Sequence, residues 1–312
     1  MHLAVLFVQM AVCVAAKVLY HGCIRKAPTA TSARDTPIII LHGLLGSSRN
    51  FQTWARMLHE RLGNSRDVIC MDLRNHGRTS SAYGSLSMDY DSMAIDVLHT
   101  IKTLGLTEVH MVGHSMGGKV AAATALKEYA QVNIKSLTMM DISPVHYPEE
   151  EFTSVSDTVT ALHELNAQMT PQTTKEEMSE KIAGMFEDKP MRAFINSNLQ
   201  ITTNGQLRWN FNIDGIHTAM ASIRDFTLLD VASQTPHKFE GPMLLLKGSD
   251  SNFVRSSHIS EVEKLFPLYN LVSIRQAGHW LHADKPEETV QRVESFICSV
   301  EEYYSKKQML AS

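Results

Sequence analysis

Short apolar runs alternate with longer amphipathic stretches along most of this chain. Apolar residues recur at helical spacing at Trp54, Met57, Leu58 and Leu62, and Lys119–Tyr129 is an alanine-rich stretch typical of a helix. Strands separated by helices predict a mostly parallel sheet with helices on both faces. Six aliphatic runs, bounded by Gly, Pro or polar residues, are typical of buried strands: Ile38–Leu41, Val68–Met71, Val109–Val112, Leu137–Met140, Met243–Leu246 and Leu271–Ile274.

The stretch from about residue 147 to residue 221 interrupts this alternation. It contains charged segments such as Lys175-Glu176-Glu177 and has no run typical of a buried strand, so we predict a helical cap inserted between two strands. Pro286-Glu287-Glu288 predicts the start of a final helix, because proline suits the first helical position and acidic residues suit the first turn. Seven apolar cap residues either pack the cap helices or line a substrate pocket: Phe152, Met169, Met178, Met185, Phe186, Met191 and Phe194.

The first 34 residues differ from the rest of the chain. Leu3–Ala16 is an almost continuous apolar run, shorter than the roughly 20 residues that a membrane-spanning helix needs. A secretory signal would be cut after Val14-Ala15-Ala16, whereas a mitochondrial transit peptide would use the acid-free, basic stretch up to Asp35. We therefore expect residues 1–34 to be a targeting segment outside the fold and residues 35–312 to form one domain.

Composition narrows the class of function. The chain is 44% hydrophobic and 20% charged, a balance typical of a globular protein. Its formal net charge of −4 gives none of the basic excess that nucleic-acid binding requires. The cysteines Cys13, Cys23, Cys70 and Cys298 have neither metal-ligand nor disulfide-framework spacing. We therefore expect no nucleic-acid partner, and we assign no cofactor and no metal; the expectation of a small-molecule substrate rests on the motifs that follow.

The segment Gly113-His114-Ser115-Met116-Gly117 lies between a predicted strand and a predicted helix. That strand–turn–helix context is the one that a nucleophile elbow requires. Glycines two residues on either side of Ser115 avoid the collisions that larger side chains would cause in a strained turn. The hydroxyl group would stand at a helix N-terminus, where backbone N–H groups face developing negative charge. We predict that Ser115 is a nucleophile.

Two further motifs supply the groups that a serine nucleophile needs. His42-Gly43-Leu44-Leu45-Gly46 follows the first strand, and with such an elbow this loop donates one oxyanion-hole N–H while the residue after the serine donates the other. We assign the hole to the backbone amides of Leu44 and Met116. His279 follows the last strand and is the predicted base, because imidazole titrates near neutral pH. His279 and His282 could resemble metal ligands, but no third ligand has suitable spacing.

Three aspartates are candidates for the acid that orients the imidazole. Asp141 and Asp250 each follow a predicted strand, and Asp214 lies where the cap returns to the core. All three fit the chain order Ser…Asp…His. We favour Asp141, because Ser251 occupies the position where an acid after the later strand usually stands. Asp214 and Asp250 stay open as alternatives.

The segment Asp72-Leu73-Arg74-Asn75-His76-Gly77-Arg78 follows the second strand. One interpretation places His76 or Arg74 at the mouth of the substrate site. The other is an Asp–Arg pair that braces a loop beneath the site. We favour the brace, because most charged loop residues have a structural or solvated role.

Together these motifs resemble the alpha/beta hydrolase domain-containing protein 11 family and its bacterial esterase relatives. The resemblance implies an α/β-hydrolase fold and a mitochondrial serine hydrolase of esters, with diacylglycerol-type lipids as a plausible substrate class. It also implies association with the 2-oxoglutarate dehydrogenase complex. It runs from about Pro37 to the final helix and rests on five segments: His42–Ser47, Asp72–Gly77, Gly113–Gly118, Asp141–Pro144 and Gly278–Ala283.

The predicted reaction is acyl transfer through a covalent ester on Ser115. One alternative is a catalytically idle member of the fold that binds a larger assembly, because fold alone does not establish function. Another keeps the triad but acts as a thioesterase, amidase or acyltransferase. The oxyanion chemistry is the same for all of these, so the sequence does not separate them. The secretory pathway is the alternative location.

Overall fold

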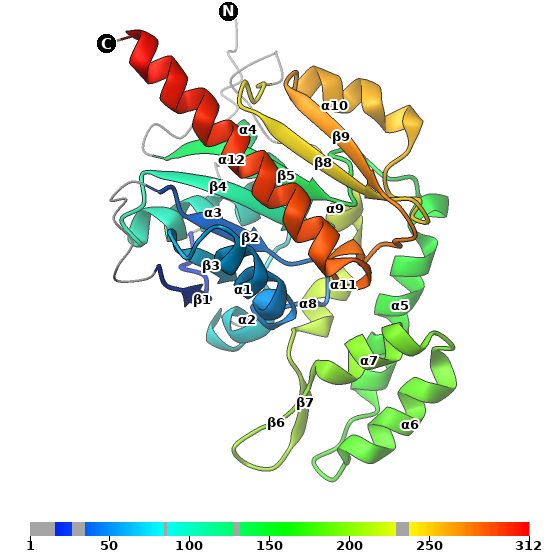
Figure 1. Cartoon of the computed structure of the whole chain (residues 1–312). Coiled ribbons are helices and arrows are strands. Elements are labelled where there is room, and N and C mark those ends of the chain that lie inside the picture. The colour runs from blue at the N-terminus through cyan, green and yellow to red at the C-terminus, as the bar shows by residue number, and fades with distance from the viewer. Residues whose placement is uncertain (1–15, 27–34, 84–85, 128–131, 229–236, 312) are drawn as a thin grey trace, which may run out of the picture.

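A seven-stranded sheet forms the centre of the protein (Figure 1). The computed structural model describes residues 16–26, 35–83, 86–127, 132–228 and 237–311. The strand order is β1-β3-β2-β4-β5-β8-β9, and every neighbouring pair is parallel except β1 with β3. All six predicted strands are present, but β9 at the edge of the sheet is largely exposed rather than buried. The strands are β1 (His21–Ile24), β2 (Ile38–Leu41), β3 (Val68–Met71), β4 (Glu108–His114), β5 (Asn133–Met140), β8 (Met243–Gly248) and β9 (Tyr269–Ile274).

Helices cover both faces of this sheet, as the alternation of runs predicts. Ile38 and Ile40 of β2 pack with one set of helices, and Ile39 and Leu41 pack with the other, because successive strand residues point to opposite faces. One set is α1 (Gln52–Arg61) and α12 (Pro286–Ala311), and the other is α3 (Tyr90–Thr103) and α4 (Met116–Leu126). The remaining core helices are α2 (Gly77–Tyr83), α10 (Ile259–Leu265) and α11 (Leu281–Asp284), with 3-10 turns at Ser48–Phe51 and Ser256–His258. Within the described ranges, every helix is too short or too polar to cross a bilayer.

The segment between β5 and β8 projects to one side of the sheet (Figure 1). The sequence predicts only helices here, yet the segment also contains an antiparallel hairpin of β6 and β7. Each of these strands is three residues long, too short for a periodic signal to be read from the sequence. The elements are α5 (Glu149–Ala167), α6 (Lys175–Met185), α7 (Lys189–Ser197), β6 (Leu199–Ile201), β7 (Leu207–Trp209), α8 (Ile213–Thr218) and α9 (Met220–Arg224).

The expectation that residues 1–34 lie outside the fold is wrong for residues 16–26. β1 pairs with the edge of β3, and Leu19 is buried in the core. The backbone N–H groups of Lys17 and Leu19 donate to the side chains of Asp96 and Thr100 at 2.7 and 2.9 Å. A half-exposed edge strand has no long apolar run, so hydrophobic patterning misses it. Residues 1–15 and 27–34 lie outside the described residues.

Leu19→Ala tests whether the N-terminal segment stabilises the domain. Leu19 is 1% exposed, so its truncation should lower the free energy of unfolding by about 2–5 kcal/mol. Urea unfolding of the full chain measures this loss. The neighbouring Val18 is 36% exposed, so Val18→Ala is the matched control and should change stability by about 0.5 kcal/mol or less. Equal stabilities for the two variants would show that the segment does not belong to the core.

Candidate active site

Ser115 occupies a strained turn between β4 and α4. Its backbone is left-handed, with φ at 53°, a conformation rare for residues other than glycine and common at functional sites. A Cβ atom on Gly113 would lie 2.2 Å from the carbonyl oxygen of Gly117, and one on Gly117 would lie 2.4 Å from that of His42. The motif therefore needs both glycines: Gly113 because the backbone of the turn folds back against it, and Gly117 because the end of β2 and the loop after it pass directly against the turn.

His279 joins Ser115 to a buried aspartate. The Ser115 hydroxyl donates to His279 Nε2 at 3.0 Å, and His279 Nδ1–H donates to Asp141 Oδ2 at 2.8 Å. His279 is in the loop after β9, whereas Asp141 immediately follows β5. Parallel strands bring their carboxyl ends to one edge of the sheet, so groups 164 and 138 residues apart in sequence meet there.

The surroundings of Asp141 keep its carboxylate in place. The backbone N–H of Gly248 donates to Oδ1 at 2.9 Å, and the hydroxyl of Ser251 donates to Oδ2. Asp141 itself is fully buried, so these donors replace the water that an ionised carboxylate would otherwise hold. Ser251, which occupies the alternative acid position, therefore supports Asp141.

The two alternative acids lie elsewhere in the structure. Asp250 is exposed at the edge of the cleft, where it accepts a hydrogen bond from Ser249. The Asp214 side chain is 67% exposed and faces His163 on α5 at 3.3 Å. Of the three aspartates, Asp141 is the one that the structure places beside His279.

Two buried histidines hold the loop after β2. Leu73 N–H donates to His42 Nε2 at 3.0 Å, so the ring proton is on Nδ1, which donates to the carbonyl of Gly43 at 2.7 Å. Leu45 N–H likewise donates to His76 Nε2 at 3.0 Å. Burial lowers the pKa of His42 to about 4 and that of His76 to about 3, so both rings stay neutral at physiological pH.

These contacts fix the direction of the Leu44 amide. The carbonyl of Gly43 accepts from both His42 and the N–H of Gly46, the latter at 3.1 Å. In a trans peptide the Leu44 N–H points opposite to that carbonyl, and therefore away from His42. A Cβ on Gly43 would lie 3.2 Å from Cβ of Ser115, so the loop lies directly beside the serine.

Arg74 supports this loop from the interior of the protein and does not line the substrate cleft. Its guanidinium forms an ion pair with Asp96 of α3, and both side chains are buried. The favoured brace is thus present, but the partner of Arg74 is Asp96 and not the nearby Asp72. Asp72 instead accepts hydrogen bonds from the backbone N–H groups of Ser48 and Arg78, at 2.6 and 2.9 Å.

Two further histidines, to which the sequence analysis assigns no role, lie near His279: His114 packs against it, and His282 packs against His114. His114 Nε2 donates to the backbone carbonyl of His279 at 2.8 Å. His282 stacks on Phe51 with ring centroids 4.3 Å apart, and its Nδ1 is buried without a partner. Burial lowers the pKa of His114 well below its usual value and that of His282 to about 3. The position of His114 beside the predicted nucleophile is the signal that could have indicated this contact.

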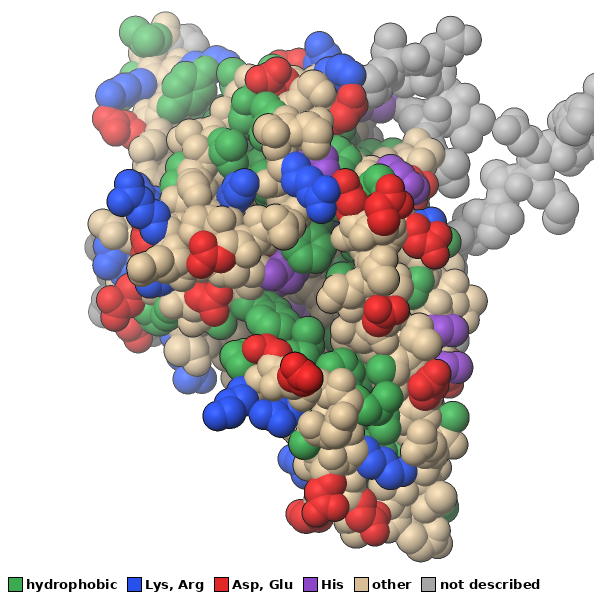
Figure 2. All heavy atoms as spheres, turned by 90° about the vertical axis from the view of Figure 1, so that its right-hand side faces the viewer, with side chains coloured by type: hydrophobic (Ala, Val, Ile, Leu, Met, Phe, Trp, Pro, Cys, Tyr) green, Lys and Arg blue, Asp and Glu red, His purple; other side chains and the backbone are tan. Residues whose placement is uncertain are grey.

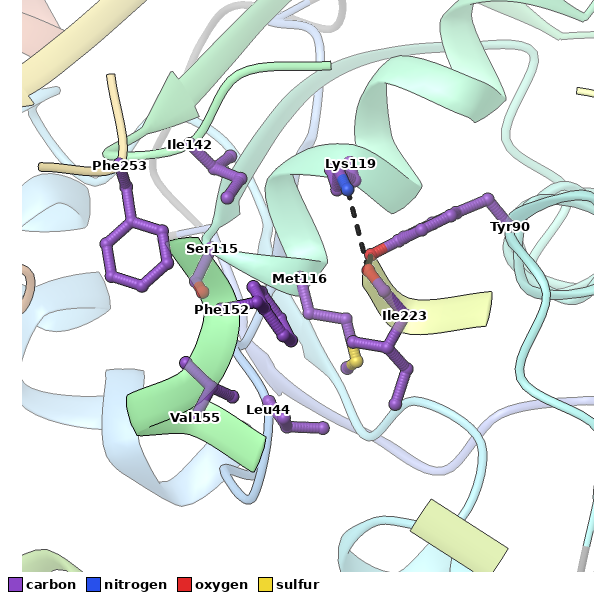
Figure 3. A pocket seen from close by; sticks show the side chains of 10 residues that line it. All are labelled: Leu44, Tyr90, Ser115, Met116, Lys119, Ile142, Phe152, Val155, Ile223 and Phe253. Atoms are coloured by element: carbon purple, nitrogen blue, oxygen red, sulfur yellow. Dashed lines mark hydrogen bonds between the residues drawn. The ribbon is translucent and has the colours of Figure 1, made fainter. Parts of the chain in front are cut away.

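Ser115 opens onto two cavities of different size. A cleft of about 660 Å³ lies between the core and the cap, and its lining includes His279, Trp280 and Phe194. Figure 2 shows hydrophobic and histidine side chains gathered near the middle of this face. A second cavity of about 20 Å³ lies deeper, with Leu44 and Met116 among its lining residues (Figure 3). Apart from Met169, Met178, Met185 and Phe186, the apolar cap residues singled out from the sequence line one of these cavities.

Comparison with known proteins identifies the family. A sequence model described as alpha/beta hydrolase fold matches residues 36–286. The chain belongs to the α/β-hydrolase family. Its curated α/β-hydrolase relatives include sn-1-specific diacylglycerol lipase ABHD11 of Danio rerio, 34% identical over 84% of this chain and 78% of that protein. Esterase YbfF of Escherichia coli is 27% identical over 88% of this chain and 98% of its own length.

A solved structure supports the same placement within the α/β-hydrolases. A marine microorganism esterase is 30% identical and covers 89% of this chain and 98% of its own, with a TM-score of 0.76. The fold class and the family predicted from the sequence are both confirmed. The chain is a hydrolase.

Because several histidines are buried and neutral, we predict that the folded protein loses stability in mild acid. His42, His76 and His282 have pKa values lowered below 6.5 by burial, so the unfolded chain binds more protons than the folded one between about pH 6.5 and pH 4. Stability should be fully present above about pH 6.5 and fall as pH decreases, by up to about 1.4 kcal/mol per pH unit for each histidine. Urea titrations at several pH values measure this slope.

His282→Phe separates this effect from general acid unfolding. Phenylalanine retains the stacking on Phe51 and removes one titrating ring. The stability lost per pH unit should therefore decrease by about the contribution of one histidine. A slope identical to that of the wild-type protein would contradict the assignment of His282 as a buried neutral ring.

Proposed function

We propose that the protein cleaves carboxylic esters through a Ser115–His279–Asp141 triad and an acyl-enzyme intermediate. The observation that carries the proposal is the continuous hydrogen-bond chain from the Ser115 hydroxyl to the buried Asp141 carboxylate, at the floor of a large cleft. Each group has the position that its role requires: the serine at the cleft, the imidazole between the two, and the acid away from water.

The reaction proceeds in two acyl-transfer steps. His279 Nε2 takes the hydroxyl proton as Ser115 Oγ bonds to the ester carbon, and Asp141 stabilises the resulting imidazolium. His279 then gives the proton to the leaving alcohol oxygen as the carbon–oxygen bond of the ester breaks. Water repeats the sequence at the acyl-enzyme and releases the carboxylic acid.

The oxyanion of each tetrahedral intermediate would bind the backbone N–H groups of Leu44 and Met116. Met116 is the first residue of α4, so its amide lies at the positive end of the helix dipole. The Leu44 amide is oriented by the contacts of His42 and Gly46 with the Gly43 carbonyl. His42 thereby acts as a positioning residue.

The cleft and the relatives suggest the substrate class. A volume of about 660 Å³ lies in the range of small-molecule sites, and the lining has more apolar than polar surface. Relatives are named as a diacylglycerol lipase and as an esterase. We therefore propose a lipid-like ester, of the diacylglycerol type among others. A thioester would use the same groups and is the second candidate.

Location and partners are proposed from the resemblance alone. Membership of a mitochondrial hydrolase group implies a mitochondrial protein associated with the 2-oxoglutarate dehydrogenase complex. The alternative, an idle α/β-hydrolase that acts only as a binding partner, predicts no turnover on a generic ester. The complete hydrogen-bond chain at Ser115 favours the enzyme.

Substitutions of the triad test the proposed mechanism. Ser115→Ala and His279→Ala should each lower kcat for p-nitrophenyl acetate by about 10⁴-fold or more and abolish fluorophosphonate labelling. Asp141→Asn should lower kcat by about 10²–10⁴-fold, because the imidazole loses its partner. Asp250→Asn is the matched control and should retain wild-type activity. Wild-type turnover by folded Ser115→Ala protein would disprove the assignment.

Two substitutions of His42 test the positioning of the oxyanion loop. An asparagine amide can replace Nδ1–H and still donate to Gly43, whereas a glutamine amide is placed to replace Nε2 and contact Leu73. His42→Gln should lower kcat by about 10–100-fold with little change in KM, and His42→Asn should retain more activity. Steady-state kinetics measure both parameters, and thermal unfolding checks that the two variants are equally stable. Equal kcat values would exclude this role.

A further inference from the structure

The two cavities at Ser115 differ in their relation to His279. The large cleft is lined by both Ser115 and His279. The small cavity is lined by Ser115 and by the two residues of the proposed oxyanion hole, Leu44 and Met116. Among the described residues that line the small cavity, His279 does not occur. The two linings share Leu44 and Phe253, whereas Met116 lines the small cavity and His279 lines the large cleft. The small cavity therefore reaches the Met116 side of the serine, and the large cleft includes the imidazole side.

The chemistry of the proposed reaction assigns the two halves of an ester to these spaces. The leaving alcohol oxygen has to lie within hydrogen-bond reach of His279 Nε2, which gives it the proton. The alcohol therefore extends into the large cleft. The acyl chain is the remaining carbon substituent of the same tetrahedral centre, and the small cavity beside Ser115 and Met116 is the space left for it. Figure 3 shows the side chains that line this cavity.

The small cavity admits only a short chain. A volume of about 20 Å³ is little more than one water-sized probe requires, which leaves room for about one or two carbon atoms beyond the ester carbonyl, as in an acetyl or propionyl group. Phe152 and Val155 of α5 form one wall, and Ile142 and Ile223 contribute further apolar side chains. The apolar wall suits an alkyl group rather than a charged one.

Hydrogen bonds fix the floor of this cavity. The buried Lys119 ammonium, one turn after Ser115 on α4, donates to the carbonyls of Arg224 and Asp225 at 3.0 and 2.9 Å. The hydroxyl of Tyr90 donates to the carbonyl of Ile223 at 2.8 Å. These contacts hold the end of α9 against α4, so the cavity cannot deepen without breaking them.

We propose that this enzyme, acting through the triad proposed above, prefers esters in which a short acyl group is joined to a large alcohol. The small cavity is the acyl site, with Phe152 and Ile223 setting its depth, and the large cleft is the alcohol site. A glycerolipid is then a good substrate only where the ester that is cleaved carries a short acyl chain.

Octyl acetate and ethyl octanoate test this assignment, because they are isomers with the two halves exchanged. The purified full chain should hydrolyse octyl acetate with a kcat/KM at least about tenfold higher than that for ethyl octanoate. Acid release followed by titration measures both. Phe152→Ala should reduce this ratio by about tenfold through a gain on ethyl octanoate, because truncation enlarges the acyl site.

Control variants make the test specific. Ile223→Val removes one methyl group from the same cavity and should shift the ratio in the same direction with less risk to folding. Phe194→Ala changes the large cleft, so its main effect should be on octyl acetate, whose long alcohol chain lies there, and it should not raise the rate on ethyl octanoate as Phe152→Ala does.

The outcomes separate this inference from the proposed function. If the protein hydrolyses p-nitrophenyl acetate but cleaves ethyl octanoate as well as octyl acetate, the assignment of the two sites is overturned while the triad stands. The same holds if folded Phe152→Ala and Ile223→Val proteins both keep the wild-type ratio. If none of the three esters is cleaved and Ser115 is not labelled by a fluorophosphonate, the proposed function and this inference both fail.

Discussion

The whole site depends on the close approach of two backbone segments at the carboxyl end of the sheet. The loop after β2 passes so near the turn after β4 that a Cβ on Gly117 would collide with the carbonyl of His42. Only glycine permits this distance, and the same approach brings Gly43, which precedes Leu44, beside Ser115. The two segments lie side by side because β2 and β4 are neighbouring parallel strands, so their approach does not depend on side-chain contacts.

Neutral histidines then make that approach rigid. His42 and His76 hold the loop after β2, and His114 holds the backbone of His279. Burial keeps these rings uncharged, so each has one fixed donor and one fixed acceptor. The same burial makes the domain sensitive to mild acid. The burial that gives these histidines a fixed orientation therefore also lowers the stability of the protein in acid.

The cap contributes to the walls of both cavities at Ser115. Its first helix, α5, contributes to both cavities, while the end of α9 is fixed to the nucleophile helix by Lys119. The groups of the proposed triad all come from the sheet edge, so in this proposal the cap sets which ester fits without altering how the ester is cleaved. This division explains why the triad chemistry alone leaves esters and thioesters undistinguished.

The sequence by itself determined six of the strands, the glycine-framed turn at Ser115 and the position of His279, because these are encoded in short contiguous patterns. Only the tertiary structure decided among Asp141, Asp214 and Asp250, since the carboxylate that meets His279 depends on strand order and not on spacing in the chain. The sequence alone also did not predict three other features: the edge strand β1, the hairpin of β6 and β7, and the pairing of Arg74 with Asp96. Each rests on contacts between segments whose local pattern is too short or too polar to reveal them.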